Sequence, residues 1–272
     1  EDYNYYDYNQ LYGYLSSFFN LNGFLVRAGY NYRYRDYSNF PDLTNNQHYA
    51  FVQLNKSFQT RTSVIIESDI GYKSFTGQDY LLSGTGSGKG RGRNQTNTTT
   101  ATSEIEEIPS LSQAIFLVRI TQSLHTKIGL NVQYRKQISL NADANFNNAN
   151  DYYQDEELFD DPFSYESDSY ASQLTWVLPW NFQAKINGAF TNKKYISEFA
   201  YTSIEDTVAV GGIRKDEQTS ANFNLTKKFF PKKKWLQTFN LFVNYAIILN
   251  KSNSYWYDYK NNYISGGFSW KF

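Results

Sequence analysis

Hydrophobic and polar residues alternate with a period of two along most of this 272-residue chain. Such alternation predicts β-strands with one apolar and one polar face. The clearest example is a pair of segments on either side of a tight turn at His125 and Thr126. In each segment apolar residues alternate with polar ones, such as Arg119 before the turn and Arg135 after it. These rows are Ala114, Phe116, Val118 and Ile120 before the turn, and Ile128, Leu130, Val132 and Tyr134 after it. No segment approaches the ~18 consecutive apolar residues that a transmembrane helix requires.

The connections between the predicted strands alternate between short and long. Short turns are expected near residues 20–23, 59–61, 125–126, 179–180 and 230–234, and long loops near 36–47, 76–111, 141–168, 196–216 and 251–261. Ten strands follow from Phe24 onward, so that residues 24–272 are predicted to form a β-barrel. The Tyr-rich segment 1–23 is an additional strand, a plug or an arm. Because single-chain barrels usually have an even number of strands, a twelfth strand is expected before Glu1 or within Tyr3 to Tyr8.

The last residues carry a terminal aromatic pattern. Ile264, Phe268, Trp270 and Phe272 alternate with polar or small residues. This pattern resembles the closing strand of bacterial outer-membrane β-barrel proteins, and the abundance of Tyr, Asn and Lys is similar to such proteins from Bacteroidota. The resemblance implies an all-β, transmembrane, antiparallel up-and-down barrel of ten to twelve strands in a bacterial outer membrane, with short periplasmic turns and long extracellular loops. It also implies contact with outer-membrane lipid and lipopolysaccharide, help from the barrel-assembly machinery during insertion, and association with other outer-membrane proteins.

Composition narrows the function classes. The chain has 25 Tyr, 21 Phe and 5 Trp, yet its mean hydropathy is negative, so its apolar residues are dispersed among polar ones. Cys is absent, which excludes disulfides and thiolate chemistry, and a net charge of zero gives no indication of a nucleic-acid partner. Met is absent too, and the chain is therefore expected to begin after a processing site or partway through a longer protein.

The predicted inward face is rich in basic residues. It comprises eight basic residues and two acidic ones, namely Arg27, Arg33, Arg35, Lys73, Arg119, Arg135, Lys185, Lys193, Glu67 and Asp69. An electropositive lumen concentrates anions, so the sequence predicts a narrow channel for small anionic solutes. Two alternatives stay open: a filled, non-conducting barrel in which Glu67 and Asp69 pair with neighbouring arginines, and an accessory subunit of a larger outer-membrane complex.

Two loop motifs suggest ligands but fail on spacing. The glycine-rich stretch from Gly84 to Gly92 contains Lys89, but Ser83 and Gly90 occupy positions where a phosphate-binding loop needs Gly and Ser or Thr. The acidic loop from Asp151 to Asp168 lacks the ligand spacing of an EF-hand. No cofactor and no metal site is therefore predicted.

Catalysis has one weak candidate. The chain has two histidines, and His125 lies in a predicted periplasmic turn. His48, near the predicted outer rim, is the residue that an outer-membrane hydrolase would pair with Asp160 or Asp161. Nothing in the sequence fixes the geometry of such a pair, so the prediction is that the chain is not an enzyme.

Overall fold

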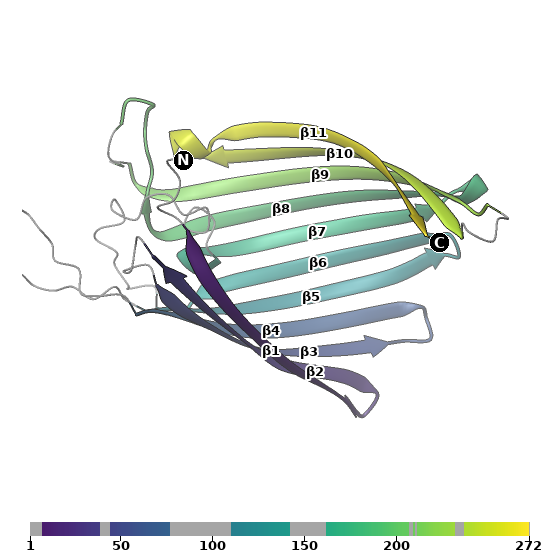
Figure 1. Cartoon of the computed structure of the whole chain (residues 1–272), viewed down its shortest axis with the longest axis horizontal. Helices are drawn as coiled ribbons and strands as arrows, with labels where there is room; N and C mark the ends of the chain where they lie inside the picture. The colour runs from purple at the N-terminus through teal and green to yellow at the C-terminus, as the bar shows by residue number, and fades with distance from the viewer. Residues whose placement is uncertain are drawn as a thin grey trace, which may run out of the picture.

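The fold is a single antiparallel sheet, seen in a computed structural model that describes residues 7–38, 44–76, 110–141, 162–206, 209, 211–231 and 237–271. Within these residues eleven strands pair strictly in chain order (Figure 1). They are β1 (Tyr8–Leu21), β2 (Phe24–Tyr37), β3 (Asn45–Ser57), β4 (Thr62–Phe75), β5 (Leu111–His125), β6 (Ile128–Ser139), β7 (Tyr165–Val177), β8 (Phe182–Phe199), β9 (Ile213–Phe229), β10 (Thr238–Ser252) and β11 (Tyr259–Lys271). Short 3-10 turns occur at η4 (Pro162–Ser164), η5 (Pro179–Asn181) and η6 (Tyr255–Tyr257). None of the helical segments in the described ranges is long and apolar enough to cross a membrane.

The short and long connections lie at opposite ends of the sheet. Figure 1 shows the tight turns at the right end and the longer connections at the left end, which we call the turn end and the loop end. The first turn is made by Asn22 and Gly23, whose φ angles are 48° and 80°. Two consecutive positive φ angles are typical of the hairpin turn whose twist matches that of paired strands. The predicted up-and-down, all-β fold with alternating connections is confirmed.

The N-terminal segment contributes a strand to the sheet. β1 pairs with β2 along its whole length, from Tyr8 opposite Tyr37 to Leu21 opposite Phe24. Of the three possibilities for residues 1–23, a strand is the form taken by the described part. Most of the Tyr3 to Tyr8 segment considered for a twelfth strand lies outside the described residues.

Burial is inverted relative to a water-soluble protein. Gln113, Gln137 and Lys73 expose 3% or less of their surface, whereas Leu15 and Ile264 expose 75% and 74%. The strand register places these polar and apolar side chains on opposite faces, so that the polar face is shielded and the apolar face is open. An exposed apolar face is stable where the surrounding medium is lipid.

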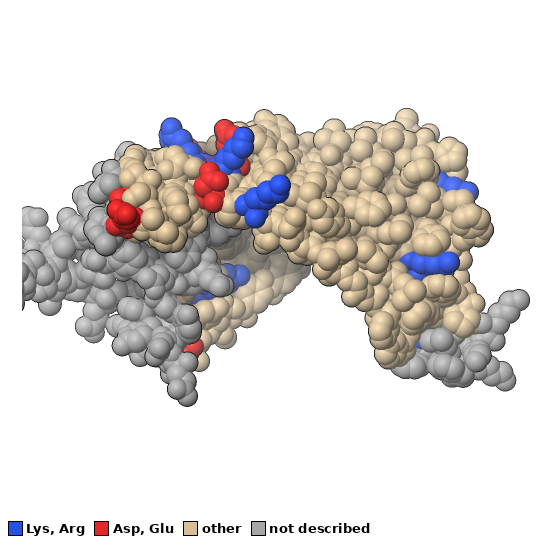
Figure 2. Space-filling view, turned by 90° about the horizontal axis from the view of Figure 1, so that it is seen from above, with Lys and Arg blue, Asp and Glu red and all other residues tan. Residues whose placement is uncertain are grey.

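The apolar face has the height of a membrane core. On β9 its residues Thr219 to Leu225 lie between the charged Glu217 and Lys227. Ten residues of strand span about 33 Å, which at the usual tilt of transmembrane strands is roughly 25 Å along the membrane normal. On the face shown in Figure 2, acidic and basic side chains gather toward the loop end, basic ones alone mark the turn end, and the band between carries none.

The two edge strands each have one neighbour. β1 pairs with β2 and β11 pairs with β10, and within the described ranges no pairing joins β1 to β11. Both strands are exposed along nearly their whole length. Their outer backbone groups are therefore available to a further strand.

Candidate functional site: the charged inner face

All ten residues predicted to line a lumen lie on one face of the sheet. Arg27, Glu67 and Arg135 belong to a single row that crosses the sheet from β2 to β6 through direct pairing partners. The other seven follow at even spacing from the rows of this face: Arg33, Arg35, Asp69, Lys73, Arg119, Lys185 and Lys193. We call this shielded polar face the inner face.

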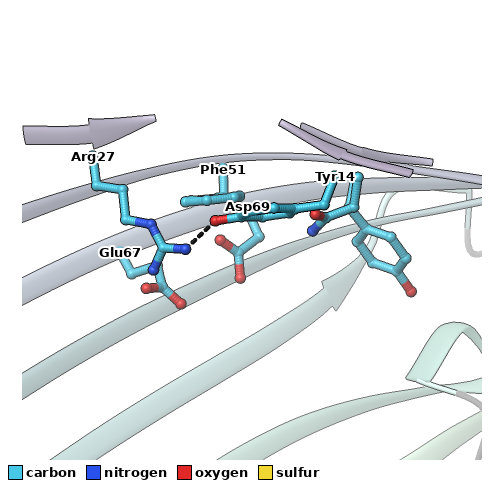
Figure 3. A pocket seen from close by; sticks show the side chains of 7 residues that line it. Tyr14, Arg27, Phe51, Glu67 and Asp69 are labelled. Carbon is cyan, nitrogen blue, oxygen red and sulfur yellow. Dashed lines mark hydrogen bonds between the residues drawn. The ribbon is translucent and has the colours of Figure 1, made fainter. Parts of the chain in front are cut away.

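A cavity on the inner face brings a basic and two acidic side chains close to aromatic rings. Its volume is about 260 Å³, and Figure 3 shows Arg27, Glu67 and Asp69 directed toward it. The Arg27 guanidinium donates a hydrogen bond to the Tyr14 hydroxyl and lies 5.2 Å from the centre of the Phe51 ring. Cation–aromatic contacts of this kind hold a guanidinium in place without neutralising it.

The aromatic members of this cavity were not found from the sequence. Tyr14, Tyr49 and Phe51 line the cavity together with Asn31, whereas the residues predicted to line the lumen were all charged. One signal was present, because Phe51 lies two residues before Gln53, a predicted inward residue, and so shares its face. Tyr14 could be assigned to the inner face only once β1 was known to be a strand in register with β2.

The two carboxylates of the inner face are not ion-paired with its arginines. Glu67 accepts a hydrogen bond from the uncharged Gln53 amide. Oδ1 of Asp69 is buried and has no hydrogen-bond partner among the described residues. The pairing of Glu67 and Asp69 with neighbouring arginines, which a filled barrel would use, is therefore absent from the part of the chain that the structure describes.

Several cations of the inner face likewise have only neutral partners. Arg119 donates from Nε to the Gln133 amide oxygen at 2.9 Å. Across the described ranges, no carboxylate lies within ion-pairing distance of Arg27, Arg119, Arg135 or Lys185. These four cations therefore form no ion pair in the described ranges, and among them Arg27 alone shares a cavity with Glu67 and Asp69.

The segment before β7 folds back over the inner face. Phe163, in η4, is 3% exposed, and its ring centre lies 5.4 Å from that of Tyr49 on β3. β3 and β7 are separated by three strands in the sheet, so η4 reaches across the concave surface. Gly71 makes room for this contact, because a Cβ there would come within 2.7 Å of the Tyr49 ring and 3.1 Å of Phe163.

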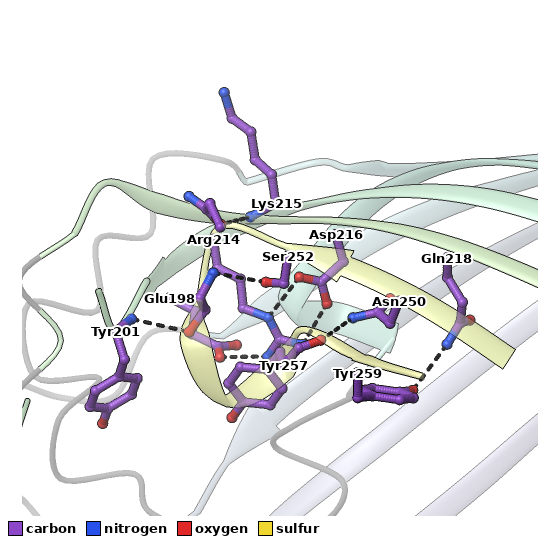
Figure 4. A network of polar contacts seen from close by, with 12 residues as sticks. Glu198, Tyr201, Arg214, Lys215, Asp216, Gln218, Asn250, Ser252, Tyr257 and Tyr259 are labelled. Carbon is purple, nitrogen blue, oxygen red and sulfur yellow. Dashed lines mark hydrogen bonds and ion pairs between the residues drawn. The ribbon is translucent and has the colours of Figure 1, made fainter. Parts of the chain in front are cut away.

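A buried ionic network closes the loop end of β8, β9 and β10. Arg214 binds Asp216 through two hydrogen bonds of 3.1 and 2.5 Å and Glu198 through one of 2.7 Å (Figure 4). Its guanidinium carbon lies 4.2 Å from the ring centre of Tyr195 and 3.2 Å from that of Tyr257. Burial raises the pKa of Tyr257, and the negative charge of Glu198 adds to this effect. The network ties η6 to the neighbouring strands, and period-two patterning alone gave no sign of it.

The histidines are placed away from any catalytic arrangement in the described residues. His48 lies on the apolar face, with Nδ1 2.5 Å from the Tyr30 hydroxyl and its ring near those of Tyr32 and Tyr72. His125 ends β5 at the turn end, beside Thr126. Asp160 and Asp161, the partners considered for His48, lie outside the described residues, as do the glycine-rich stretch from 84 to 92 and most of the acidic loop. No group of three metal-ligating side chains occurs within the described ranges.

The C-terminal pattern lies on the apolar face. Ile264, Phe268 and Trp270 are exposed, and Phe272 is outside the described residues. Phe268 stacks on Trp270 at 5.3 Å and contacts Phe239 at 6.1 Å, which forms an aromatic cluster at the turn end. Aromatic clusters at this level are typical of the membrane–water interface.

Comparison with known proteins finds a distant structural likeness. No protein-family model matches the chain, and no curated protein matches its sequence. Among solved structures, OccAB1 of Acinetobacter baumannii aligns with a TM-score of 0.44 and 11% identity over 92% of this chain. The chain spans 58% of the length of that protein. The strand order, the inverted burial and the apolar band show, on their own, the architecture of a bacterial outer-membrane β-barrel, with the seam between β1 and β11 unpaired in the described ranges.

Proposed function

We propose that this chain forms the wall of a narrow outer-membrane channel whose inner face favours small anionic solutes. The observation that supports the proposal is that Arg27, Arg119 and Arg135 share the inner face and have no carboxylate partner among the described residues. Unpaired charges are costly inside a dry, filled barrel and are well solvated beside water. A water-filled lumen with basic walls raises the local concentration of anions.

The cavity at Arg27 has mixed charge, in contrast to the basic residues elsewhere on the inner face. The guanidinium is held by Tyr14 and Phe51, and its charge is available to a carboxylate or phosphate group of the solute. Glu67 and Asp69 line the same cavity and add two carboxylates, so the anion preference depends on Arg119, Arg135 and the other cations of the inner face.

The test is the single-channel conductance of the purified protein in a planar bilayer, with a salt gradient across the membrane. We expect a steady current with a reversal potential that indicates anion preference. In the triple variant Arg27→Gln, Arg119→Gln, Arg135→Gln the reversal potential shifts toward cation preference, because the charge of the lumen wall is reduced. A matched control removes three cations of the apolar face, Lys56→Gln, Lys227→Gln and Lys260→Gln, and leaves the selectivity unchanged. Well-folded protein that gives no current, or a current with cation preference, contradicts the proposal.

A second candidate function is supported by the edge strands. The unpaired edges of β1 and β11 favour a role as one part of a larger outer-membrane assembly. Because the chain has no Cys, single substitutions such as Ser16→Cys on β1 and Ser265→Cys on β11 report contacts cleanly. A disulfide within the double variant shows that the edges meet in one molecule, whereas a linked dimer of either single variant shows a second copy at that edge. If neither forms and another membrane protein co-purifies after gentle extraction, the accessory role is supported.

A further inference from the structure

We propose that a charged cluster on the apolar face, at the loop end of β6 to β9, binds the phosphorylated headgroup of a lipopolysaccharide molecule in the outer leaflet. We call it the rim cluster, and it consists of Lys136, Glu166, Asp168, Lys194, Lys215 and Glu217. These side chains border a shallow cleft of about 410 Å³ that extends over four strands. The proposal requires the loop end to face outward, and it is independent of whether the barrel conducts.

The position of the rim cluster corresponds to the headgroup level of the membrane. On β6, β7 and β9 the cluster follows directly on the apolar band, as Glu217 does on β9, and on β8 Asn192 lies between Phe190 and Lys194. Long loops belong to the outer side of outer-membrane barrels, so the loop end faces the leaflet that contains lipopolysaccharide. The cluster therefore lies beside phosphorylated sugars rather than beside acyl chains.

Two lysines of the cluster form no ion pair within the described residues. Lys194 and Lys215 are direct pairing partners on β8 and β9, both are exposed, and neither ammonium has an ion-pair partner among the described residues. Figure 4 shows the Lys215 side chain pointing away from the Arg214 network. Like charges directly opposite each other on a sheet repel, and a phosphate group between the two ammonium groups removes the part of this repulsion that Glu166, opposite Lys194 on β7, does not offset.

The third lysine is held in place by its neighbours. Lys136 forms an ion pair with Asp168 at 3.0 Å, and the Tyr134 hydroxyl donates to the same carboxylate at 2.6 Å. Glu166 lies directly opposite Lys194, and Glu217 lies two residues from Lys215 on the same face of β9. Carboxylates next to phosphates are bridged by divalent cations, which prefer oxygen ligands, so the mixed charge of the rim cluster fits a headgroup that carries its own Ca²⁺ or Mg²⁺.

The surface directly below the cluster fits the acyl chains of the same lipid. The rings of Tyr134 and Tyr170 lie 5.1 Å apart, and Phe190 continues this row on β8. A free phosphate ion would use the lysines but not this apolar surface. An amphipathic ligand with phosphate above and hydrocarbon below uses both.

The experiment measures binding of purified rough lipopolysaccharide to the detergent-solubilised full chain by native mass spectrometry, in the presence of Mg²⁺. Each lysine beside an anionic lipid surface contributes roughly fivefold to affinity, so the variant Lys194→Gln, Lys215→Gln is expected to bind about 25-fold more weakly. The control variant Lys56→Gln, Lys227→Gln removes two cations of the same face at the turn end and keeps the affinity of the parent chain. A difference in gel migration between unheated and boiled samples verifies that both variants are folded.

Three further ligands identify what the cluster recognises. Dephosphorylated lipid A and phosphatidylethanolamine are expected to bind at least tenfold more weakly than lipopolysaccharide and to be insensitive to the Lys194 and Lys215 changes. Inorganic phosphate at equal concentration is expected to leave lipopolysaccharide bound. Equal binding by the two double variants, equal affinity for dephosphorylated lipid A, or displacement by inorganic phosphate would each overturn the proposal.

Discussion

Arg214 shows how a single charged residue is accommodated in a shielded part of the sheet. Only 4% of its side chain is exposed, and it lies between two tyrosine rings with carboxylates on either side. Asp216 lies two residues along the same strand and is equally buried, so strand geometry places both groups on the inner face. A buried ion pair adds little net stability, but removal of one partner leaves an uncompensated charge.

This arrangement predicts an unequal response to the loss of two aspartates. We expect Asp216→Ala to lower the free energy of unfolding by about 3 kcal/mol, because Arg214 is left buried with one partner fewer. Asp168→Ala breaks the Lys136 pair, whose side chains are 43% and 38% exposed, and is expected to cost about 1 kcal/mol or less. Urea unfolding in detergent free of lipopolysaccharide measures both. Equal losses would show that the burial of Arg214 has no energetic consequence.

We expect the stability of the turn at Asp206, in the loop between β8 and β9, to depend on pH. Hydrogen bonds from the Thr202 hydroxyl and from the amides of Ser203 and Thr202 lower the pKa of this carboxyl from 3.8 to about 2. Because the folded pKa is the lower one, the turn has its full stability above about pH 4 and loses it as the pH falls toward 2. Amide hydrogen exchange at Thr202 and Ser203, corrected for its intrinsic pH dependence, should accelerate over this interval. In Asp206→Asn the protection should be weaker at neutral pH and should not change between pH 5 and 2.

At the scale of elements, η4 depends on one glycine of β4. Gly71 permits Tyr49 and Phe163 to meet across the inner face, because the space for a Cβ is already occupied by their rings. A glycine in a strand interior often marks such a close approach. The position of η4 over the sheet is therefore determined partly by β4.

Gly71→Ala is expected to displace η4 and to destabilise the protein by about 1–3 kcal/mol, as overpacking usually does. Faster amide exchange at Phe163 and Ser164 would report the displacement. Gly129→Ala is the matched control, since a Cβ at that strand position meets nothing within 4 Å. Unchanged exchange in the Gly71 variant would mean that the rings move aside without cost to the contact.

For the whole molecule, the two faces of the sheet predict opposite tolerance to charge. Phe223 lies near the middle of the apolar band on β9, and Ser220 lies on the inner face of the same strand. Phe223→Arg is expected to lower the free energy of unfolding by about 2–4 kcal/mol, because arginine is then placed in the centre of the bilayer. Ser220→Arg should cost much less, since the inner face is polar. Reversible unfolding in lipid vesicles measures the difference, and similar values for the two variants would exclude the membrane orientation.

Acidic residues are distributed unevenly along the membrane normal. None occurs in 113–137, 175–197 or 223–257, the stretches that contain three of the turn-end hairpins, so the charged residues of these stretches are all basic. Lys227 at this end contacts the rings of Phe182 and Phe229 at 4.6 and 4.9 Å. A lysine whose side chain packs against aromatic rings can place its ammonium group at the level of the phospholipid headgroups.

The amino-acid sequence by itself determined the strands, their two faces and the alternation of turns and loops. A period of two fixes which side chains share a face, and this local property survives any later packing. For this reason the ten charged residues predicted for the lumen lie on one face of the sheet. The nature of β1 was left open, because a Tyr-rich segment has the same composition as a strand, a plug or an arm.

Only the tertiary structure decided which of these residues meet. The neutral partners of Arg27 and Glu67, the reach of Phe163 to Tyr49 and the enclosure of Arg214 depend on register and curvature over several strands. The like-charged pair of Lys194 and Lys215 likewise exists only once β8 and β9 are aligned. Contacts between distant strands are set by the summed pairing of the whole sheet, and the alternation within one strand contains no information about them.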